Sequence, residues 1–244
     1  MAIAEELSEE SLFGGTLRCL QPRQGYRFSV DAVLLAHFFT PQPEARILDL
    51  GAGCGVVSLI LSHRWPTANL VALELQPRLA EVVRRNVAIN SLASRVTVLE
   101  GDCRRITDLL PQNSFDWVAA NPPYYPTESG RHNPETERAK ARHEILGGIG
   151  EMAKAASFAL RSGGRAAFVY PAARGEILLG ILREKGLAPK RLRMVHPYPG
   201  AEAGLVLVEA VKDGSDELEV LPPFFIYQEK GGAYTVEMAA MYAG

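Results

Sequence analysis

The segment Asn121-Pro122-Pro123-Tyr124 combines residue types that could hold a flat, amine-bearing group. It places a side-chain amide, two rigid prolines and an aromatic ring next to one another. The preceding residues, 115–120, are mostly apolar and predict a buried strand, which must end here because proline has no N–H for a ladder. We therefore expect this segment at the carboxyl edge of a sheet, where open α/β folds bind ligands. The alternative is a proline-rich turn that only ends the strand.

A second candidate site is the glycine-rich segment 51–55, which follows an apolar strand predicted over residues 46–50. Its glycines allow the backbone to turn sharply and to approach a ligand closely. The spacing is G-x-G-x-G, whereas loops that hold dinucleotide phosphates have G-x-G-x-x-G. Asp49 stands directly before the first glycine, where it would repel a pyrophosphate but would suit a cationic amino-acid group. The segment therefore favours a cationic ligand, and a nicotinamide cofactor stays open as an alternative.

Two further acidic positions follow the next two predicted strands. Glu74 ends a strand about 20 to 25 residues after the glycines, the usual place for an acid that binds ribose hydroxyls. Asp102 follows the third strand, where it could accept from an adenine amine. S-adenosylmethionine has an ammonium, a ribose diol and an adenine amine but no phosphate, so it fits this set; each acid alone could equally cap a helix. The predicted cofactor-binding residues are Asp49, Gly51, Gly53, Gly55, Glu74, Asp102, Cys103 and Asn121.

Strand and helix patterns alternate along the chain, which predicts an α/β fold with a mostly parallel sheet covered on both faces. Two extended runs, 191–196 and 204–211, follow one another without a helix between them and predict an antiparallel hairpin at the sheet edge. The other predicted strands are 46–50, 69–74, 95–99, 115–120 and 165–170, and the predicted helices are 32–39, 56–61, 79–87, 145–156 and 176–185.

The two ends of the chain are expected to add little to this core. Residues 1 to about 10 look like a frayed tail, residues 12–20 like a short hairpin, and residues 224–227 like an extended tail that ends the chain. Ser29 and Asp31 are both candidate N-caps of the first helix, and Asp31 is the preferred one. These patterns predict an N-terminal tail, hairpin and capping helix over residues 1–40 and a single globular unit over 41–244.

Composition excludes several classes of protein. The chain has 244 residues, 47% of them hydrophobic, but no apolar run near the length of about 18 residues that a membrane helix needs. The acidic N-terminus is not a secretory signal. Three cysteines fit no zinc or disulfide pattern, which favours a reducing cytoplasm, and the five histidines predict no metal site. The net charge of −2 still allows local basic stretches, and residues 131–142 and 183–193 are candidate RNA contacts.

The chain resembles class I methyltransferases that carry an N-P-P-Y motif, and most closely the bacterial tRNA(Val) adenosine N6-methyltransferase family. The matching segments are 21–36 with its G-Y-R-F-S-x-D pattern, the glycine segment, 120–125, and Ala141-Arg142-His143-Glu144. The resemblance implies a Rossmann-like, seven-stranded sheet that ends in an antiparallel hairpin. It also implies S-adenosylmethionine as cofactor and an adenosine in a tRNA anticodon loop as acceptor, with no DNA partner.

We predict that the Asn121 side-chain oxygen and the Pro122 carbonyl each accept one amine hydrogen, while Pro123 stiffens the turn. Tyr124 would stack on the base, Arg27 would reach the cofactor carboxylate and Phe28 would cover the cofactor, although Phe28 fits core packing equally well. Three rival functions stay open: the same chemistry on a protein glutamine amide or on guanine N2, a nicotinamide-dependent oxidoreductase, and a cofactor-binding scaffold without activity.

Overall fold

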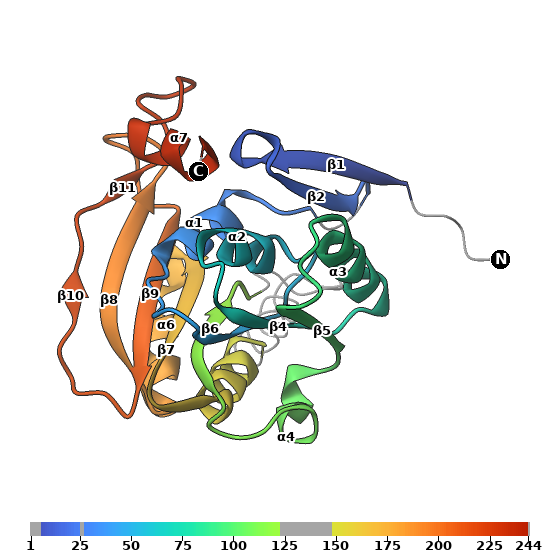
Figure 1. Ribbon diagram of the computed structural model, residues 1–244. Coiled ribbons are helices and arrows are strands. Elements are labelled where there is room, and N and C mark those ends of the chain that lie inside the picture. The colour runs from blue at the N-terminus through green and yellow to red at the C-terminus, as the bar shows by residue number, and fades with distance from the viewer. Residues whose placement is uncertain (1–5, 25–26, 123–147, 244) are drawn as a thin grey trace, which may run out of the picture.

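The computed structural model describes residues 6–24, 27–122 and 148–243 (Figure 1). Its centre is a nine-stranded sheet with the strand order β10-β8-β9-β7-β6-β3-β4-β5, and β11 also pairs with β8. Along the part of this order that runs β7-β6-β3-β4-β5, each pair of neighbouring strands is parallel. Strand β9 is antiparallel to both β7 and β8. The principal strands are β3 (Arg46–Leu50), β4 (Asn69–Glu74), β5 (Val96–Glu100), β6 (Phe115–Ala120), β7 (Leu160–Pro171), β8 (Leu187–His196) and β9 (Leu205–Lys212).

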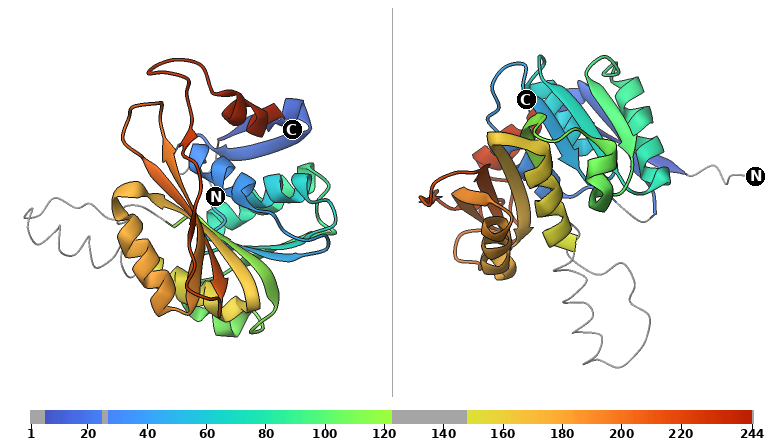
Figure 2. Two further views of the ribbon diagram at one scale, coloured as in Figure 1. Left: turned by 90° about the vertical axis from the view of Figure 1, so that its left-hand side faces the viewer. Right: turned by 90° about the horizontal axis from the view of Figure 1, so that it is seen from below.

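Helices cover both faces of this sheet because successive side chains of each buried strand point to opposite sides (Figure 2). In β3, Ile47 joins the apolar cluster under one group of helices, whereas Leu48 and Leu50 join the cluster under the other. The first group is α1 (Val30–Phe38), α2 (Val56–Arg64) and α3 (Pro77–Ile89); the second is α4 (Ile106–Leu109), a helix over residues 148–159, and α6 (Gly175–Glu184). The predicted α/β class is confirmed. None of the described helices is long and apolar enough to cross a membrane.

The C-terminal segment differs from the expectation. The sheet has nine strands rather than seven because two short strands, β10 (Glu219–Val220) and β11 (Phe224–Phe225), pair with the outer side of β8. The prediction that an extended tail ends the chain is wrong, since α7 (Val236–Ala243) follows and packs against α1. Met238 is the one fully buried side chain of α7, and Met241 and Tyr242, three and four residues later, pack against the same apolar cluster.

The N-terminal hairpin is longer than expected. Its strands β1 (Leu7–Leu12) and β2 (Leu17–Pro22) are joined by the turn η1 (Phe13–Gly15), so the predicted frayed tail is wrong from Leu7 onward. The hairpin docks on α3, where Asn90 bonds both the backbone N–H and the carbonyl of Arg18, at 2.9 and 2.7 Å. Helix α1 begins one residue after Ser29, so Asp31 lies inside its first turn and is not the N-cap.

Candidate active site

The predicted site residues meet at the carboxyl edge of the parallel strands. In the register, Leu50 at the end of β3 pairs with Leu73 of β4 on one side and with Ala120 of β6 on the other. Glu74 pairs with Glu100 at the end of β5. The residues that follow these adjacent strands therefore lie along one edge, and these are the glycine segment, Glu74, Asp102 and Asn121.

The glycine segment has a backbone conformation that other residues rarely adopt. Gly51, Gly53 and Gly55 have φ values of +77°, +59° and +85°. A Cβ atom at Gly55 would lie 2.9 Å from Cγ1 of Val83 in α3, and one at Gly51 would lie 3.2 Å from Cε of Met152. The segment thus forms a tight turn packed between two helices, in which a side chain at Gly55 would clash with Val83 and one at Gly51 would have to displace the end of Met152.

The backbone amides of this turn are already used within the protein. Gly51 and Ala52 both donate to the Leu73 carbonyl, at 2.9 and 3.0 Å, and Gly55 donates to the Ala52 carbonyl at 2.8 Å. The Gly53 amide donates to Glu74 Oε2 at 2.8 Å. Phosphate-binding loops point such N–H groups at the ligand instead. The arrangement is therefore poorly suited to a dinucleotide pyrophosphate.

Asp49 is almost completely buried beneath the glycine segment. Its Oδ2 accepts hydrogen bonds from both the backbone N–H and the Oγ of Ser58, at 3.0 and 2.7 Å. It thereby provides an acceptor for a backbone N–H in the first turn of α2. Burial raises the pKa of Asp49 to about 6, although the bonds from Ser58 oppose the shift. Within the described residues only Oδ2 accepts hydrogen bonds, which leaves Oδ1 available to a cationic ligand.

Glu74 is also buried, and both of its carboxylate oxygens accept backbone hydrogen bonds. Besides Oε2, its Oε1 accepts from the Gln76 amide at 2.8 Å. Burial raises the pKa of Glu74, and the backbone bonds oppose this shift. Each oxygen retains a second lone pair, so the carboxylate can hold the turn and still accept from ligand hydroxyls.

Asp102 and Cys103 lie beyond β5. Asp102 accepts from the backbone N–H of Arg104 at 2.9 Å and from its Nε at 2.8 Å, so it caps a short helical turn, as the alternative interpretation held. The Arg104 guanidinium keeps the pKa of Asp102 low. Burial raises the pKa of Cys103 to about 11, so its thiol is neutral. Their contacts with a cofactor stay predictions.

Arg27 and Phe28 contact other parts of the protein. The Arg27 guanidinium bonds Glu10 at 2.9 Å and Ser8 Oγ at 3.1 Å, both on β1. Phe28 is half-buried against the cluster under α1, and its amide donates to Gln21 Oε1 at 3.2 Å. These contacts agree with core packing for Phe28, and roles of either residue toward a cofactor stay predictions.

Asn121 and Pro122 are the described part of the N-P-P-Y motif. They directly follow β6, with Asn121 half-buried and Pro122 buried. The predictions for Pro123 and Tyr124 fall outside the described residues, and so do those for the basic stretch 131–142 and the matching segment 141–144.

Sequence reasoning missed Asn86, which ties the hairpin to the glycine segment. It lies fully buried in α3, donates to the carbonyls of Leu20 and Cys54 at 2.8 Å each, and accepts from the Leu20 amide at 2.7 Å. Its position could have indicated this role, because Asn86 lies on the same apolar face of the predicted helix as Val83 and Val87. A polar side chain buried on such a face must find hydrogen-bond partners.

Comparison with known proteins decides the family. The family model for the methyltransferase small domain matches residues 30–175, more than half of the chain. The chain belongs to this family. The prediction of an enzyme that transfers a methyl group from S-adenosylmethionine is thereby confirmed.

Curated relatives of this methyltransferase carry one name, tRNA1(Val) (adenine(37)-N6)-methyltransferase. The protein from Porphyromonas gingivalis (strain ATCC 33277) is 31% identical over 189 residues, which cover 75% of this chain and 73% of its own. The protein from Bacteroides fragilis (strain YCH46) is 31% identical over 182 residues, covering 75% and 76%. The protein from Vibrio campbellii is 28% identical and covers 80% of each chain.

Solved structures confirm the methyltransferase fold. A predicted O-methyltransferase from Agrobacterium tumefaciens superimposes with a TM-score of 0.72 at 24% identity, covering 87% of this chain and 95% of its own. TrmN from Thermus thermophilus gives a TM-score of 0.57 at 22% identity, covering 74% of this chain and 48% of its own. At these identities the similarity shows the fold alone.

Proposed function

We propose that this methyltransferase modifies an exocyclic amine, and that the amine is N6 of an adenosine in a tRNA anticodon loop. The observation that carries the proposal is the position of Asn121 and Pro122 at the end of β6. That strand lies directly beside β3, whose end leads into the glycine segment. The names of the curated relatives support tRNA adenosine as the acceptor. A tRNA substrate also fits the cytoplasmic location expected from the cysteines.

The residues at this edge fit S-adenosylmethionine. The glycine turn packs closely against Val83 and Met152, and its amides donate to acceptors within the protein and are not offered to a phosphate. Asp49 would hold the ammonium through Oδ1, Glu74 would accept from the ribose hydroxyls, and Asp102 would accept from the adenine amine. When bound, S-adenosylmethionine supplies an electrophilic methyl group carried on a sulfonium.

Asn121 and Pro122 are suited to activating an aromatic amine. Such an amine is a poor nucleophile because its lone pair is delocalised into the ring. The Asn121 side-chain oxygen and the Pro122 carbonyl would each accept one hydrogen, which favours a nitrogen whose lone pair points away from the ring plane. Both acceptors follow a buried strand, and the proline ring fixes its own φ, so they act as preorganised dipoles. Stacking of the base on Tyr124 completes the proposal.

The two acceptors also bear on the rival substrates. A substrate hydroxyl has only one hydrogen, so either the Asn121 oxygen or the Pro122 carbonyl would be left without a hydrogen bond. An amine therefore fits better than an alcohol. A protein glutamine amide and guanine N2 are flat NH₂ groups and fit equally well. The choice of tRNA adenosine over these two groups therefore rests on the names of the curated relatives.

A labelling experiment tests the proposal. The purified protein is incubated with labelled S-adenosylmethionine and an extract from cells that lack its gene, and the products are divided between ribonuclease and protease digestion. We expect label in tRNA that ribonuclease releases. Label that only protease releases would overturn the proposal in favour of the glutamine acceptor. Calorimetry with NADH, which we expect not to bind, tests the oxidoreductase alternative.

A further inference from the structure

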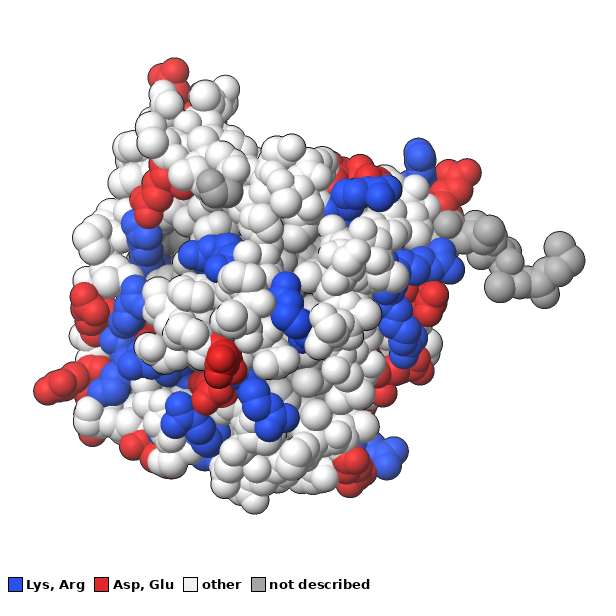
Figure 3. Space-filling view, viewed as in Figure 1, with Lys and Arg blue, Asp and Glu red and all other residues white. Residues whose placement is uncertain are grey.

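Two surfaces of the described residues carry several basic side chains, and they differ in how many of these cations have a carboxylate partner. On the face shown in Figure 3, Lys and Arg residues lie among Asp and Glu residues. On strands β7 and β8, Arg165 and Arg191 both pair with Glu209 of β9, whose side chain is fully buried, and Arg193 pairs with Glu237 at 2.8 Å. Each of these guanidiniums has a carboxylate partner, but Arg165 and Arg191 share theirs, so the three guanidiniums keep one net positive charge.

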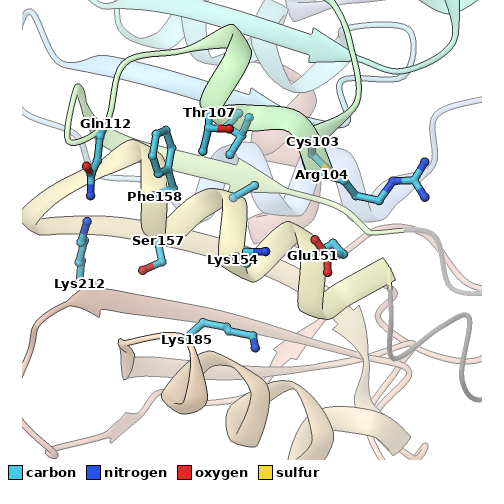
Figure 4. Close-up of a pocket in the computed structure, with 12 residues that line it drawn as sticks. Cys103, Arg104, Thr107, Gln112, Glu151, Lys154, Ser157, Phe158, Lys185 and Lys212 are labelled. Carbon is cyan, nitrogen blue, oxygen red and sulfur yellow. The ribbon is translucent and has the colours of Figure 1, made fainter.

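The second surface is a groove of about 380 Å³ beside the helix over residues 148–159 (Figure 4). Four cationic side chains line this basic groove, against one acidic side chain, that of Glu151. Figure 4 shows that they come from separate elements, with Lys154 on the helix and Lys185 at the end of α6. The four cations are Arg104, Lys154, Lys185 and Lys212.

Two of these four cations have carboxylate partners, Arg104 in Asp102 and Lys185 in Glu184, and among the described residues the other two do not. Lys212 Nζ is held by two neutral oxygens, Asn113 Oδ1 at 2.7 Å and the Leu160 carbonyl at 2.8 Å. Lys154 is exposed, and within the described parts of the chain neither it nor Lys212 has a carboxylate partner. An ammonium that is already positioned and lacks a counter-ion gains from an anion and loses little side-chain entropy in binding it.

The basic groove begins at the active-site edge. One end is formed by Cys103 and Arg104, which directly follow Asp102, and the other end by Gln112 and Lys212. Between them the helix runs from Glu151 to Phe158, a length of about 10 Å at 1.5 Å per residue. That distance matches about three stacked nucleotides at about 3.4 Å each.

We propose that the basic groove binds backbone phosphates of the RNA substrate as the strand leaves the active-site edge. This inference rests on the proposed function, because it takes RNA to be the acceptor. Lys154, Lys185 and Lys212 are not among the predicted cofactor-binding residues, so they set affinity for RNA and leave the chemical step unchanged. The predicted basic stretch 183–193 is thereby divided: Lys185 lines the groove, where it also pairs with Glu184, whereas Arg191 and Arg193 pair with Glu209 and Glu237 outside the groove.

Salt dependence of tRNA binding tests the inference, because each phosphate contact adds about −0.7 to −0.9 to the slope of log K against log salt. Lys154→Ala and the double variant Lys154→Ala/Lys185→Ala are compared with Lys190→Ala. The control removes the same charge outside the groove, where Lys190 Nζ bonds Ser215 Oγ at 2.6 Å. Lys212 is left intact because its ammonium also holds the Leu160 carbonyl.

We expect the slope to become shallower by about 1 in Lys154→Ala and by about 1.5 in the double variant, with Lys190→Ala unchanged. KM for tRNA should rise several-fold in the groove variants, while kcat and the affinity for S-adenosylmethionine stay at the wild-type values. Wild-type slopes in variants of an enzyme that methylates tRNA would overturn the groove and leave the proposed function standing. A wild-type protein that neither binds nor methylates tRNA would overturn the proposed function itself.

Discussion

Glu74 Oε2 accepts a hydrogen bond of 2.8 Å from the backbone N–H of Gly53. Through this bond, the end of β4 fixes the turn that follows β3. The other oxygen of the same carboxylate accepts from Gln76 at 2.8 Å, so both oxygens have structural partners before any ligand binds. The conformation of the glycine segment therefore depends on an acid that we also assign to the ribose.

Replacing Glu74 with Gln should weaken S-adenosylmethionine binding by at least about tenfold. The amide keeps the size of the side chain, but its NH₂ must face one of the two backbone N–H groups, and a buried donor left unpaired costs about 1–3 kcal/mol. Calorimetric titration measures the affinity. Glu100→Gln is the matched control, since Glu100 ends the neighbouring strand, is 44% exposed and contacts Arg84 only at 3.7 Å. Equal affinities in the two variants would contradict this view of the turn.

Asp49 should make stability fall as the pH rises from about 4 to about 6. Its pKa is raised to about 6 in the folded state, whereas an unfolded chain has the ordinary value of about 3.9. Between these values the folded protein holds a proton that the unfolded chain has released, so folding is favoured at the acidic end. In Asp49→Asn this contribution disappears. Urea unfolding of both proteins at several pH values measures it, and parallel stability curves would contradict the raised pKa.

The same carboxyl group should release a proton when S-adenosylmethionine binds. A nearby ammonium favours the charged form of Asp49 and lowers its pKa. Near pH 6 the apparent binding enthalpy of the wild type should therefore vary with the ionisation enthalpy of the buffer. The enthalpy of Asp49→Asn should not vary in this way. Absence of the effect in the wild type would place the ammonium elsewhere.

The core of the fold could be predicted from sequence because its signals are local. Strands β4 and β6 occupy the predicted residues 69–74 and 115–120, where apolar runs are bounded by polar or turn residues. Gly186 follows the end of α6 with a φ of +74°, as expected of a residue that ends a helix. The order of strand ends then placed the glycine segment and Asn121 on one edge.

What could not be predicted depends on distant partners. Strand β2 is held by Asn86 and Asn90, more than 60 residues away in the sequence, so nothing local marks how far the hairpin extends. The ion pair between Asp102 and Arg104 depends on side-chain directions that spacing does not define. The two-residue strands β10 and β11 exist only because β8 offers them a free edge.

Asn86→Ala should cost about 2–4 kcal/mol of stability, because it leaves the buried Cys54 carbonyl and the partly buried amide and carbonyl of Leu20 without their partners. Asn90→Ala is the control: Asn90 also bonds β2, but it is half-exposed, so water can replace its side chain. We expect a loss below about 1 kcal/mol there. Urea unfolding measures both values, and limited proteolysis reports release of the hairpin. Similar losses in the two variants would contradict the linking role of Asn86.

Asn121→Ala should lower the single-turnover rate by about 10²–10³-fold, the usual effect of losing one preorganised polar contact. The affinity for S-adenosylmethionine should change much less. Asn121→Asp keeps an acceptor oxygen at the same position and should retain more of the rate than the alanine variant. An unchanged rate in Asn121→Ala would remove the proposed alignment of the amine.

The most direct measurement is mass spectrometry of the nucleosides that the purified enzyme produces from unmodified tRNA and S-adenosylmethionine. We predict N6-methyladenosine, formed by the wild type and nearly absent with Asn121→Ala. Methylation of guanine N2, or tRNA that stays unmodified while a protein glutamine gains the methyl group, would contradict the account.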